Sequence, residues 1–261
     1  GHFKNIIDYC KDLKWVHILG TGVNAFPLEL AQDKLITCSR GATAGPISEW
    51  VLAMMLSFEK QLPIRKLTAP PKTWYMADLG SLEGKTLGLV GFGAIGQAIA
   101  KKALAFDMTV IAKVRTHRKS PMPNVTFEQD LETILSKSDH VALALPATRS
   151  NHHLINAHSL AQMKQGAHLI NISRADLVDQ GALKACLDAG HIAHASLDVV
   201  TPEPLPAGHW MYGHPRIFLS PHISWNSPES QARIVASFFD NVKAFMDNRP
   251  LIGTVDTKAG Y

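Results

Sequence analysis

Residues 84–119 constrain the fold more than any other stretch of this 261-residue chain. Within them, the apolar run Thr86–Val90 leads directly into Gly91, Gly93 and Gly96. An apolar run of this length predicts a buried parallel strand, and the glycine spacing predicts a turn into a helix. The first glycine allows the tight turn, the second lets the backbone approach a diphosphate, and the third lets the helix pack closely on the strand. The stretch therefore favours a dinucleotide-binding βαβ unit.

The predicted helix after this turn would direct its N-terminus at the diphosphate. Helix N-termini offer free N–H groups and the positive end of the helix dipole to anions. The cofactor contacts predicted for the turn are Gly91, Gly93, Ala94, Ile95 and Gly96.

The residues after the next predicted strand indicate which dinucleotide is bound. Sites for NAD(H) usually carry an acid about 20 positions past the start of the glycine turn, at the ribose hydroxyls. Here residues 113–119 read K-V-R-T-H-R-K and contain no acid. An arginine fork binds a 2′-phosphate bidentately, whereas a carboxylate repels it. We therefore predict NADP(H) as the preferred cofactor and NAD(H) as a possible one, with Arg115, Thr116 and Arg118 at the phosphate; a solvated basic loop is the alternative.

Composition argues against several other classes of protein. Hydrophobic residues make up 46% of the chain and charged residues 18%, which fits a packed globular core. The formal net charge of +4 is mild, and no basic block with interleaved aromatics indicates nucleic-acid binding. The longest apolar runs are too short to span a membrane, and Cys10, Cys38 and Cys186 lack metal-type pairing. We expect a cytoplasmic protein that binds neither metal, membrane nor nucleic acid.

Apolar runs and amphipathic stretches alternate along the chain, which predicts an α/β fold with a mainly parallel, doubly wound sheet of Rossmann type. The predicted strands are 15–19, 35–38, 86–90, 108–112, 139–145, 167–172, 192–197 and 217–220. The predicted helices are 46–60, 94–106, 126–138, 159–165, 179–189 and 227–248.

Chemically capable side chains follow several of these strands. Arg174, Asp198 and His222 each come after a different predicted strand, and Glu203 lies five residues after Asp198. In such sheets ligands bind beyond the carboxyl ends of the strands. An arginine can hold a carboxylate and polarise a carbonyl, and a histidine beside a carboxylate can pass a proton near neutral pH. These are the parts needed to reduce a 2-oxo acid with a hydride, although each residue taken singly could be structural.

Short motifs across nearly the whole chain carry a family resemblance. They are I-L-G-T-G-V-N at 18–24, G-F-G-A-I-G at 91–96, L-P-A-T-R-S at 145–150, H-L-I-N-I-S-R-A at 168–175, S-L-D-V at 196–199, E-P-L-P at 203–206 and P-H-I at 221–223. In this order and spacing they resemble the D-2-hydroxyacid dehydrogenase family, nearest its glyoxylate/hydroxypyruvate reductase branch. The chain departs from the family pattern at Asn24, usually aspartate, and at Ala175, usually glycine.

The resemblance implies a role for each site residue. Arg174 would bind the substrate carboxylate and carbonyl, His222 would be the general acid in reduction, and Glu203 would pair with it and favour its protonated form. On the cofactor side the implied residues are Pro146, Ile172 and Asp198, the last at the nicotinamide carboxamide. On the substrate side they are the backbone of Thr21 and Gly22, Arg174 and, as a pocket wall, Trp225.

The resemblance also implies a domain organisation. Residues 1–82 would be a smaller, flavodoxin-like substrate domain with a linker, and this domain is expected to be truncated at its N-terminal side. Residues 83–226 would bind the dinucleotide, and residues 227–261 would return to the substrate domain as a helix and tail. A homodimer is implied as well, with Trp50, Met54 and Trp74 as candidate contacts.

Two alternatives stay open. One is a dinucleotide-sensing, corepressor-like interaction protein of the same fold. The other is a dehydrogenase for a bulkier or phosphorylated 2-hydroxy acid, because a wall at Trp225 could either fill space or stack on a large substrate.

Overall fold

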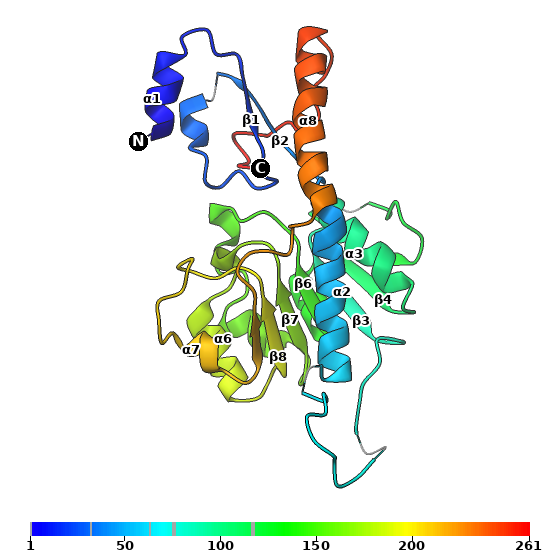
Figure 1. The fold of residues 1–261 in the computed structure, drawn as a ribbon. Helices are drawn as coiled ribbons and strands as arrows, with labels where there is room; N and C mark the ends of the chain where they lie inside the picture. The colour runs from blue at the N-terminus through cyan, green and yellow to red at the C-terminus, as the bar shows by residue number, and fades with distance from the viewer. Residues whose placement is uncertain (1, 32, 63, 75–76, 116–117) are drawn as a thin grey trace.

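Two parallel β-sheets organise the molecule (Figure 1). The computed structural model describes residues 2–261 except 32, 63, 75–76 and 116–117. The smaller sheet pairs β1 (Trp15–Ile18) with β2 (Leu35–Cys38). The strands of the larger sheet are β3 (Thr86–Val90), β4 (Thr109–Lys113), β5 (Val125–Glu128), β6 (His140–Leu143), β7 (His168–Asn171), β8 (His194–Leu197) and β9 (Ile217–Leu219), in the spatial order β5-β4-β3-β6-β7-β8-β9. The predicted doubly wound α/β fold is confirmed.

Helices connect the strands and cover both faces of the larger sheet. They are α1 (His2–Tyr9), α2 (Ala44–Lys60), α3 (Ala94–Leu104), α4 (Leu131–Lys137), α5 (Ala157–Gln162), α6 (Gln180–Asp188), α7 (Trp210–Gly213) and α8 (Pro228–Met246), with short 3-10 turns at Leu28–Ala31, Arg149–Asn151 and Ala175–Leu177. Within the described residues, no helix is both long and apolar enough to cross a bilayer.

The core of the larger sheet has two layers because alternate residues of each strand face opposite sides. Leu87 and Leu89 pack with Met55 of α2 and Ile99 of α3 on one side. On the other side, the equivalent layer joins residues of β6 and β7 to α5 and α6, through Val141, Leu143, Leu169, Leu160 and Leu183. Burying a large aliphatic side chain of this kind contributes about 1.5–3 kcal/mol. These layers hold the carboxyl ends of the strands in fixed positions.

The chain reverses its direction across the larger sheet between β5 and β6. It runs outward from β3 through β4 to β5 and then crosses back to β6, which pairs with the opposite side of β3. In open α/β sheets, ligands bind at this topological switch point, beyond the carboxyl ends of the strands.

The segment after the larger sheet returns to the smaller one. Helix α8 runs up beside β1 and β2 (Figure 1), where Trp15 stacks on Phe238 and Phe245 with ring centroids 5.9 and 5.5 Å apart. Beyond α8, Thr254 forms an antiparallel bridge with Thr37 of β2. The domain limits at 82/83 and 226/227 stay a prediction. Helix α2 belongs to the predicted substrate domain, residues 1–82, yet it packs on α3 and the larger sheet.

One predicted helix was wrong in its first half. Residues 126–138 were expected to be helical, but Val125–Glu128 forms the edge strand β5, paired with β4. Asp130 then begins α4 by accepting hydrogen bonds from the N–H groups of Glu132 and Thr133. The periodicity of the segment suits a helix. However, its first residues pair with the open edge of the sheet at β4, and the N-cap at Asp130 delays the start of the helix.

Candidate active site

His222 and Glu203 form the central pair of the candidate site. His222 Nδ1 lies 2.9 Å from Glu203 Oε2, and each side chain is about 40% exposed. The second carboxylate oxygen of Glu203 accepts a hydrogen bond from the N–H of Val200 at 3.1 Å. Because a ring nitrogen that donates to a carboxylate fixes the tautomer, Nε2 is the atom of His222 left to exchange a proton with a ligand.

Asp198 holds the backbone that follows His222. It comes directly after β8 and is 1% exposed. Its Oδ1 accepts from the N–H of Ile223 at 2.9 Å and from the hydroxyl of Ser220, and its Oδ2 accepts from the N–H of Ser224 at 3.0 Å. Asp198 therefore positions the backbone around His222, a role that the sequence did not indicate. Its contact with the nicotinamide carboxamide stays a prediction.

Trp225 also acts on His222. Its indole Nε1 donates to the carbonyl oxygen of His222 at 3.0 Å. His222 has a φ of +55°, in the left-handed region, which costs a non-glycine residue roughly 1–3 kcal/mol unless its surroundings hold it there. The indole and the Asp198 carboxylate thus stabilise the conformation that presents the imidazole.

Arg174 lies between the two sheets. Its Nε donates to Asn24 Oδ1 at 3.2 Å and its Nη1 to the carbonyl of Ser173 at 2.6 Å. Burial lowers the pKa of Arg174, and the charges of Glu203 and Asp176 oppose that effect. Glu203 thereby links the arginine to the histidine electrostatically.

Gly22 packs directly under this guanidinium. A Cβ atom on Gly22 would lie 1.7 Å from Arg174 Nη2, so any larger residue here would displace the guanidinium from its present position. The neighbouring Thr21 side chain bonds the Ser39 carbonyl at 3.3 Å and Thr43 Oγ1 at 3.1 Å. The structure therefore brings the predicted substrate-binding backbone and the predicted catalytic arginine together.

Asn24 bridges the two sheets and was not predicted as a site residue. Its Nδ2 donates to the carbonyl of Ala147 at 3.0 Å, while its Oδ1 accepts from Arg174. The one signal for this role in the sequence was the asparagine in place of the usual aspartate. An asparagine amide can both donate and accept hydrogen bonds, whereas an ionised aspartate only accepts them.

The glycine turn fits a dinucleotide diphosphate. Gly91 has a φ of +109°, and a Cβ there would lie 2.5 Å from the carbonyl oxygen of Ala144. A Cβ on Gly96 would lie 2.4 Å from the carbonyl oxygen of Gly91, whereas one on Gly93 would meet nothing described within 4 Å. Gly93 is the N-cap of α3, so the N–H groups of Ala94 and Ile95 begin a helix whose end carries no capping side chain. That arrangement suits a bound anion.

The remaining predicted cofactor residues lie along the same edge of the sheet. Pro146 follows β6 and its carbonyl accepts from Asn151 Nδ2 at 2.8 Å, while Ile172 follows β7 and is 6% exposed. Arg115 is exposed after β4, with its Cζ 5.1 Å from the centroid of the Tyr261 ring. Arg118 lies over the ring of Phe127 at 5.6 Å, and Thr116 is outside the described residues.

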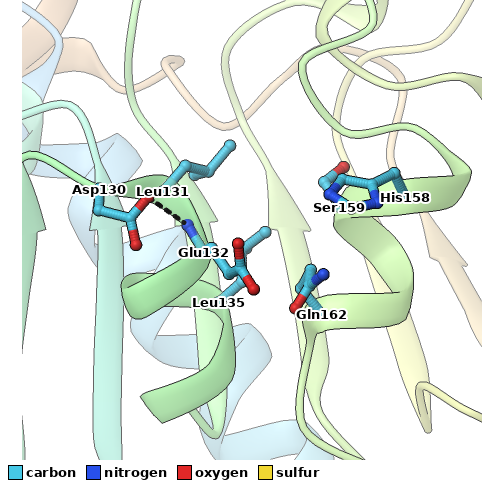
Figure 2. A pocket seen from close by; sticks show the side chains of 7 residues that line it. All are labelled: Asp130, Leu131, Glu132, Leu135, His158, Ser159 and Gln162. Atoms are coloured by element: carbon cyan, nitrogen blue, oxygen red, sulfur yellow. Dashed lines mark hydrogen bonds between the residues drawn. The ribbon is translucent and has the colours of Figure 1, made fainter.

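A separate cavity of about 190 Å³ lies where α4 and α5 begin (Figure 2). Its lining residues are Asp130, Leu131, Glu132, Leu135, His158, Ser159 and Gln162. They include none of the predicted site residues, and the Asp130 carboxylate is occupied by the cap of α4. In the described part of the chain, no three His, Cys, Asp or Glu side chains are arranged to hold a metal ion.

Comparisons with known proteins agree with this arrangement. Residues 52–224 match the family described as D-isomer specific 2-hydroxyacid dehydrogenase, NAD binding domain. The chain is 32% identical to a glyoxylate reductase from Thermofilum pendens over 88% of this chain and 70% of that protein. It is 30% identical to a D-3-phosphoglycerate dehydrogenase from Bacillus subtilis over 98% of this chain, but spans only 50% of that protein. An NADPH-dependent glyoxylate/hydroxypyruvate reductase from Sinorhizobium meliloti, solved with NADP and sulfate, is similar with a TM-score of 0.87 at 26% identity, over 98% of this chain and 83% of that one.

Proposed function

The chain belongs to the D-isomer specific 2-hydroxyacid dehydrogenase family, and on that premise we propose that it reduces a small 2-oxo acid to the D-2-hydroxy acid with NADPH. The family makes it an NAD(P)-dependent oxidoreductase. The relatives named for glyoxylate and hydroxypyruvate favour a substrate of that size. The observation that carries the proposal is the His222–Glu203 pair at 2.9 Å. The charge of Glu203 also raises the pKa of Arg174, against the effect of burial.

Each side chain of the site has a part in this reaction. The Arg174 guanidinium, which packs on the Cα of Gly22, and the backbone N–H of that glycine would hold the substrate carboxylate. His222 Nε2 would give its proton to the carbonyl oxygen, and Glu203 would stabilise the charged ring through Nδ1. The bound dinucleotide supplies the hydride that the carbonyl carbon receives, and the protein supplies orientation and charge.

The preference for NADPH rests on the end of β4. Arg115 and Arg118 are exposed there, and residues 113–119 contain no carboxylate. The similar structure from Sinorhizobium meliloti is described as NADPH-dependent. Thr116 stays a predicted phosphate ligand.

A panel of 2-oxo acids assayed with NADPH and with NADH tests the proposal. We expect turnover of glyoxylate and hydroxypyruvate with NADPH, and much weaker turnover of phenylpyruvate and 3-phosphohydroxypyruvate. His222→Ala and Arg174→Ala should each lower kcat by about 10²–10⁴-fold while NADPH binding, followed by fluorescence, is retained. Full turnover in either variant, or a clear preference for NADH, would contradict the proposal.

We also propose a homodimer. The described residues of the segment between α2 and β3, which extends away from the larger sheet in Figure 1, expose the apolar side chains of Leu62, Ile64, Leu67, Trp74 and Leu79. Apolar patches of this kind on a soluble domain mark interaction surfaces. Trp50 and Met54 of α2 are half-buried and supply the adjoining surface. Sedimentation at micromolar concentration should give the mass of two chains; a monomer would exclude the dimer.

A further inference from the structure

The ring of Tyr261 packs against the side chain of Arg115, the residue on which the cofactor preference depends. The 5.1 Å between Arg115 Cζ and the ring centroid is within the range of a cation–π contact. Arg115 is exposed, and a free arginine side chain on a surface samples many rotamers. A ring against one face of the guanidinium restricts those rotamers and leaves the N–H groups at its edge available to an anion.

A structured segment positions Tyr261. After the bridge between Thr254 and Thr37, the N–H of Val255 donates to the carbonyl of Ile36 in β2 at 2.9 Å. The chain then turns back on itself, with Asp256 N–H donating to the Tyr261 carbonyl at 3.0 Å. The ring is thus attached to the smaller sheet.

The same turn is closed at two further points. The Gly260 N–H donates to the Asp256 carbonyl at 2.8 Å, and Asp256 Oδ1 accepts from the N–H groups of Lys258 and Ala259, each at 2.9 Å. Those N–H groups lower the pKa of the Asp256 carboxyl, and Arg115 adds a smaller effect in the same direction. The electrostatic effect of Arg115 on Asp256 is a second sign, beside the ring contact, that the turn lies next to the arginine.

The backbone of Arg115 is fixed from the other side. Its carbonyl accepts from Gln129 Nε2 at 3.0 Å, and Lys113 Nζ donates to the Gln129 carbonyl at 2.6 Å. Both partners of the stacked pair are therefore anchored, one in each sheet.

From these contacts we propose that Tyr261 is a specificity-determining residue of the cofactor site: it holds the Arg115 guanidinium in place for the 2′-phosphate. The inference rests on the proposed NADPH preference. It makes the phosphate site a composite of the larger sheet, which supplies Arg115, and the smaller sheet, which carries Tyr261.

Calorimetry with 2′,5′-ADP, which has the 2′-phosphate, and with 5′-AMP, which lacks it, tests the proposal without turnover. Tyr261→Leu should weaken 2′,5′-ADP binding by about two- to fivefold, the range of an exposed cation–π contact, and leave 5′-AMP unchanged. Tyr261→Phe should bind both probes like the wild type because the ring is retained. Tyr9→Leu, at a tyrosine that is 89% exposed, is the matched control for the substitution itself. The ratio of kcat/KM for NADPH and NADH should fall in parallel.

Arg115→Ala tests the proposed NADPH preference separately from the role of Tyr261. We expect it to weaken 2′,5′-ADP binding by more than tenfold, and Tyr261→Leu to have no further effect in that background. Unchanged binding in Arg115→Ala would overturn the NADPH preference itself. If Arg115→Ala weakens 2′,5′-ADP binding, two results for Tyr261→Leu would overturn only the role of Tyr261. One is wild-type binding of 2′,5′-ADP, and the other is an equal loss of affinity for 2′,5′-ADP and 5′-AMP.

Discussion

Gly22 and Arg174 show how a single missing side chain shapes the candidate site. They are far apart in the sequence, yet the guanidinium occupies the space that a Cβ on Gly22 would need. Asn24 and the Ser173 carbonyl hold the same guanidinium at Nε and Nη1. The position of Arg174 is therefore decided by its neighbours as much as by its own place after β7.

Gly22→Ala should displace Arg174 and lower kcat/KM for the 2-oxo acid by about tenfold to a hundredfold, because a shift of about 1 Å in a positioning group has effects of this size. NADPH affinity should not change. Gly20→Ala is the matched control, since its Cβ would meet its nearest described neighbour at 3.7 Å. Equal activity in the two variants, measured by steady-state kinetics, would show that Arg174 does not depend on this contact.

Trp225→Phe should lower kcat by about fivefold with little change in KM. The substitution keeps an aromatic ring but removes the indole N–H that holds the His222 carbonyl, and a net hydrogen bond is worth about 1 kcal/mol. Trp210→Phe, in a half-buried tryptophan whose ring lies 5.8 Å from that of His209, is the control. A change confined to KM would instead make Trp225 a wall of the substrate pocket.

At the scale of secondary-structure elements, the β3–α3 turn uses its glycines for different purposes. Gly96 is buried, and a Cβ there would clash with the Gly91 carbonyl, so this glycine serves the packing of helix on strand. Gly93 is exposed, and a Cβ there would meet no described atom within 4 Å, so this glycine leaves room for a ligand above the turn.

Gly96→Ala should therefore destabilise the fold by about 1–3 kcal/mol, the range for overpacking a tight contact. Gly93→Ala should unfold at the wild-type temperature but bind NADPH more weakly, because its methyl group would project towards the diphosphate. Thermal melts and fluorescence titrations separate the two effects. Loss of stability in Gly93→Ala with unchanged NADPH affinity would contradict this division of roles.

At the opposite end of the strands, three histidines lie in register at the starts of β6, β7 and β8: His140, His168 and His194. His168 stacks on Phe58 of α2 at 4.8 Å and bonds His140 at 3.2 Å. Burial lowers the pKa of His168 well below 6.5, helped by the charges of His140 and His194. Burial, with a smaller effect of His214, lowers the pKa of His194 to about 4.

The protein should therefore lose stability as the pH falls from about 6.5 towards 4. Both histidines take up protons near 6.5 when unfolded but not when folded, so acid favours the unfolded state. The melting temperature should drop by several degrees between pH 7.5 and pH 5. His194→Gln should reduce that drop, whereas His158→Gln, at an exposed histidine, should not. A melting temperature independent of pH over this range would refute the account.

At the scale of the whole molecule, the candidate site depends on how the two sheets meet. Asn24 donates to Ala147 beside the larger sheet and accepts from Arg174. Arg233 of α8 donates to the Ala42 carbonyl at 2.8 Å, near the start of α2. These contacts join residues more than a hundred positions apart.

Asn24→Ala should loosen this arrangement while each sheet remains folded. We expect kcat/KM for the 2-oxo acid to fall by about fivefold to thirtyfold, the loss of one or two hydrogen bonds of about 1 kcal/mol each, with NADPH affinity unchanged. Hydrogen exchange should increase at residues 145–148. Exchange and kinetics identical to those of the wild type would show that the bridge has no function.

The sequence by itself determined the elements whose pattern is local. The glycine turn, the alternation of strands and helices and the acid-free run after β4 are each encoded within about 30 residues, where periodicity and turn chemistry act directly. The expectation that Arg174, Glu203 and His222 would share an edge of the sheet needed only the parallel direction of the strands. Their catalytic roles remain a proposal.

Only the tertiary structure decided the features that join distant segments. Strand β5 exists because β4 offered it an edge, against the helical periodicity of 126–138. The bonds of Asp198, the place of Gly22 under Arg174 and the contact of Tyr261 with Arg115 join residues 22 or more positions apart. Such contacts depend on the packing of whole sheets and helices, which no local pattern contains, and they decide how the glycine turn and the strand-end residues become one site.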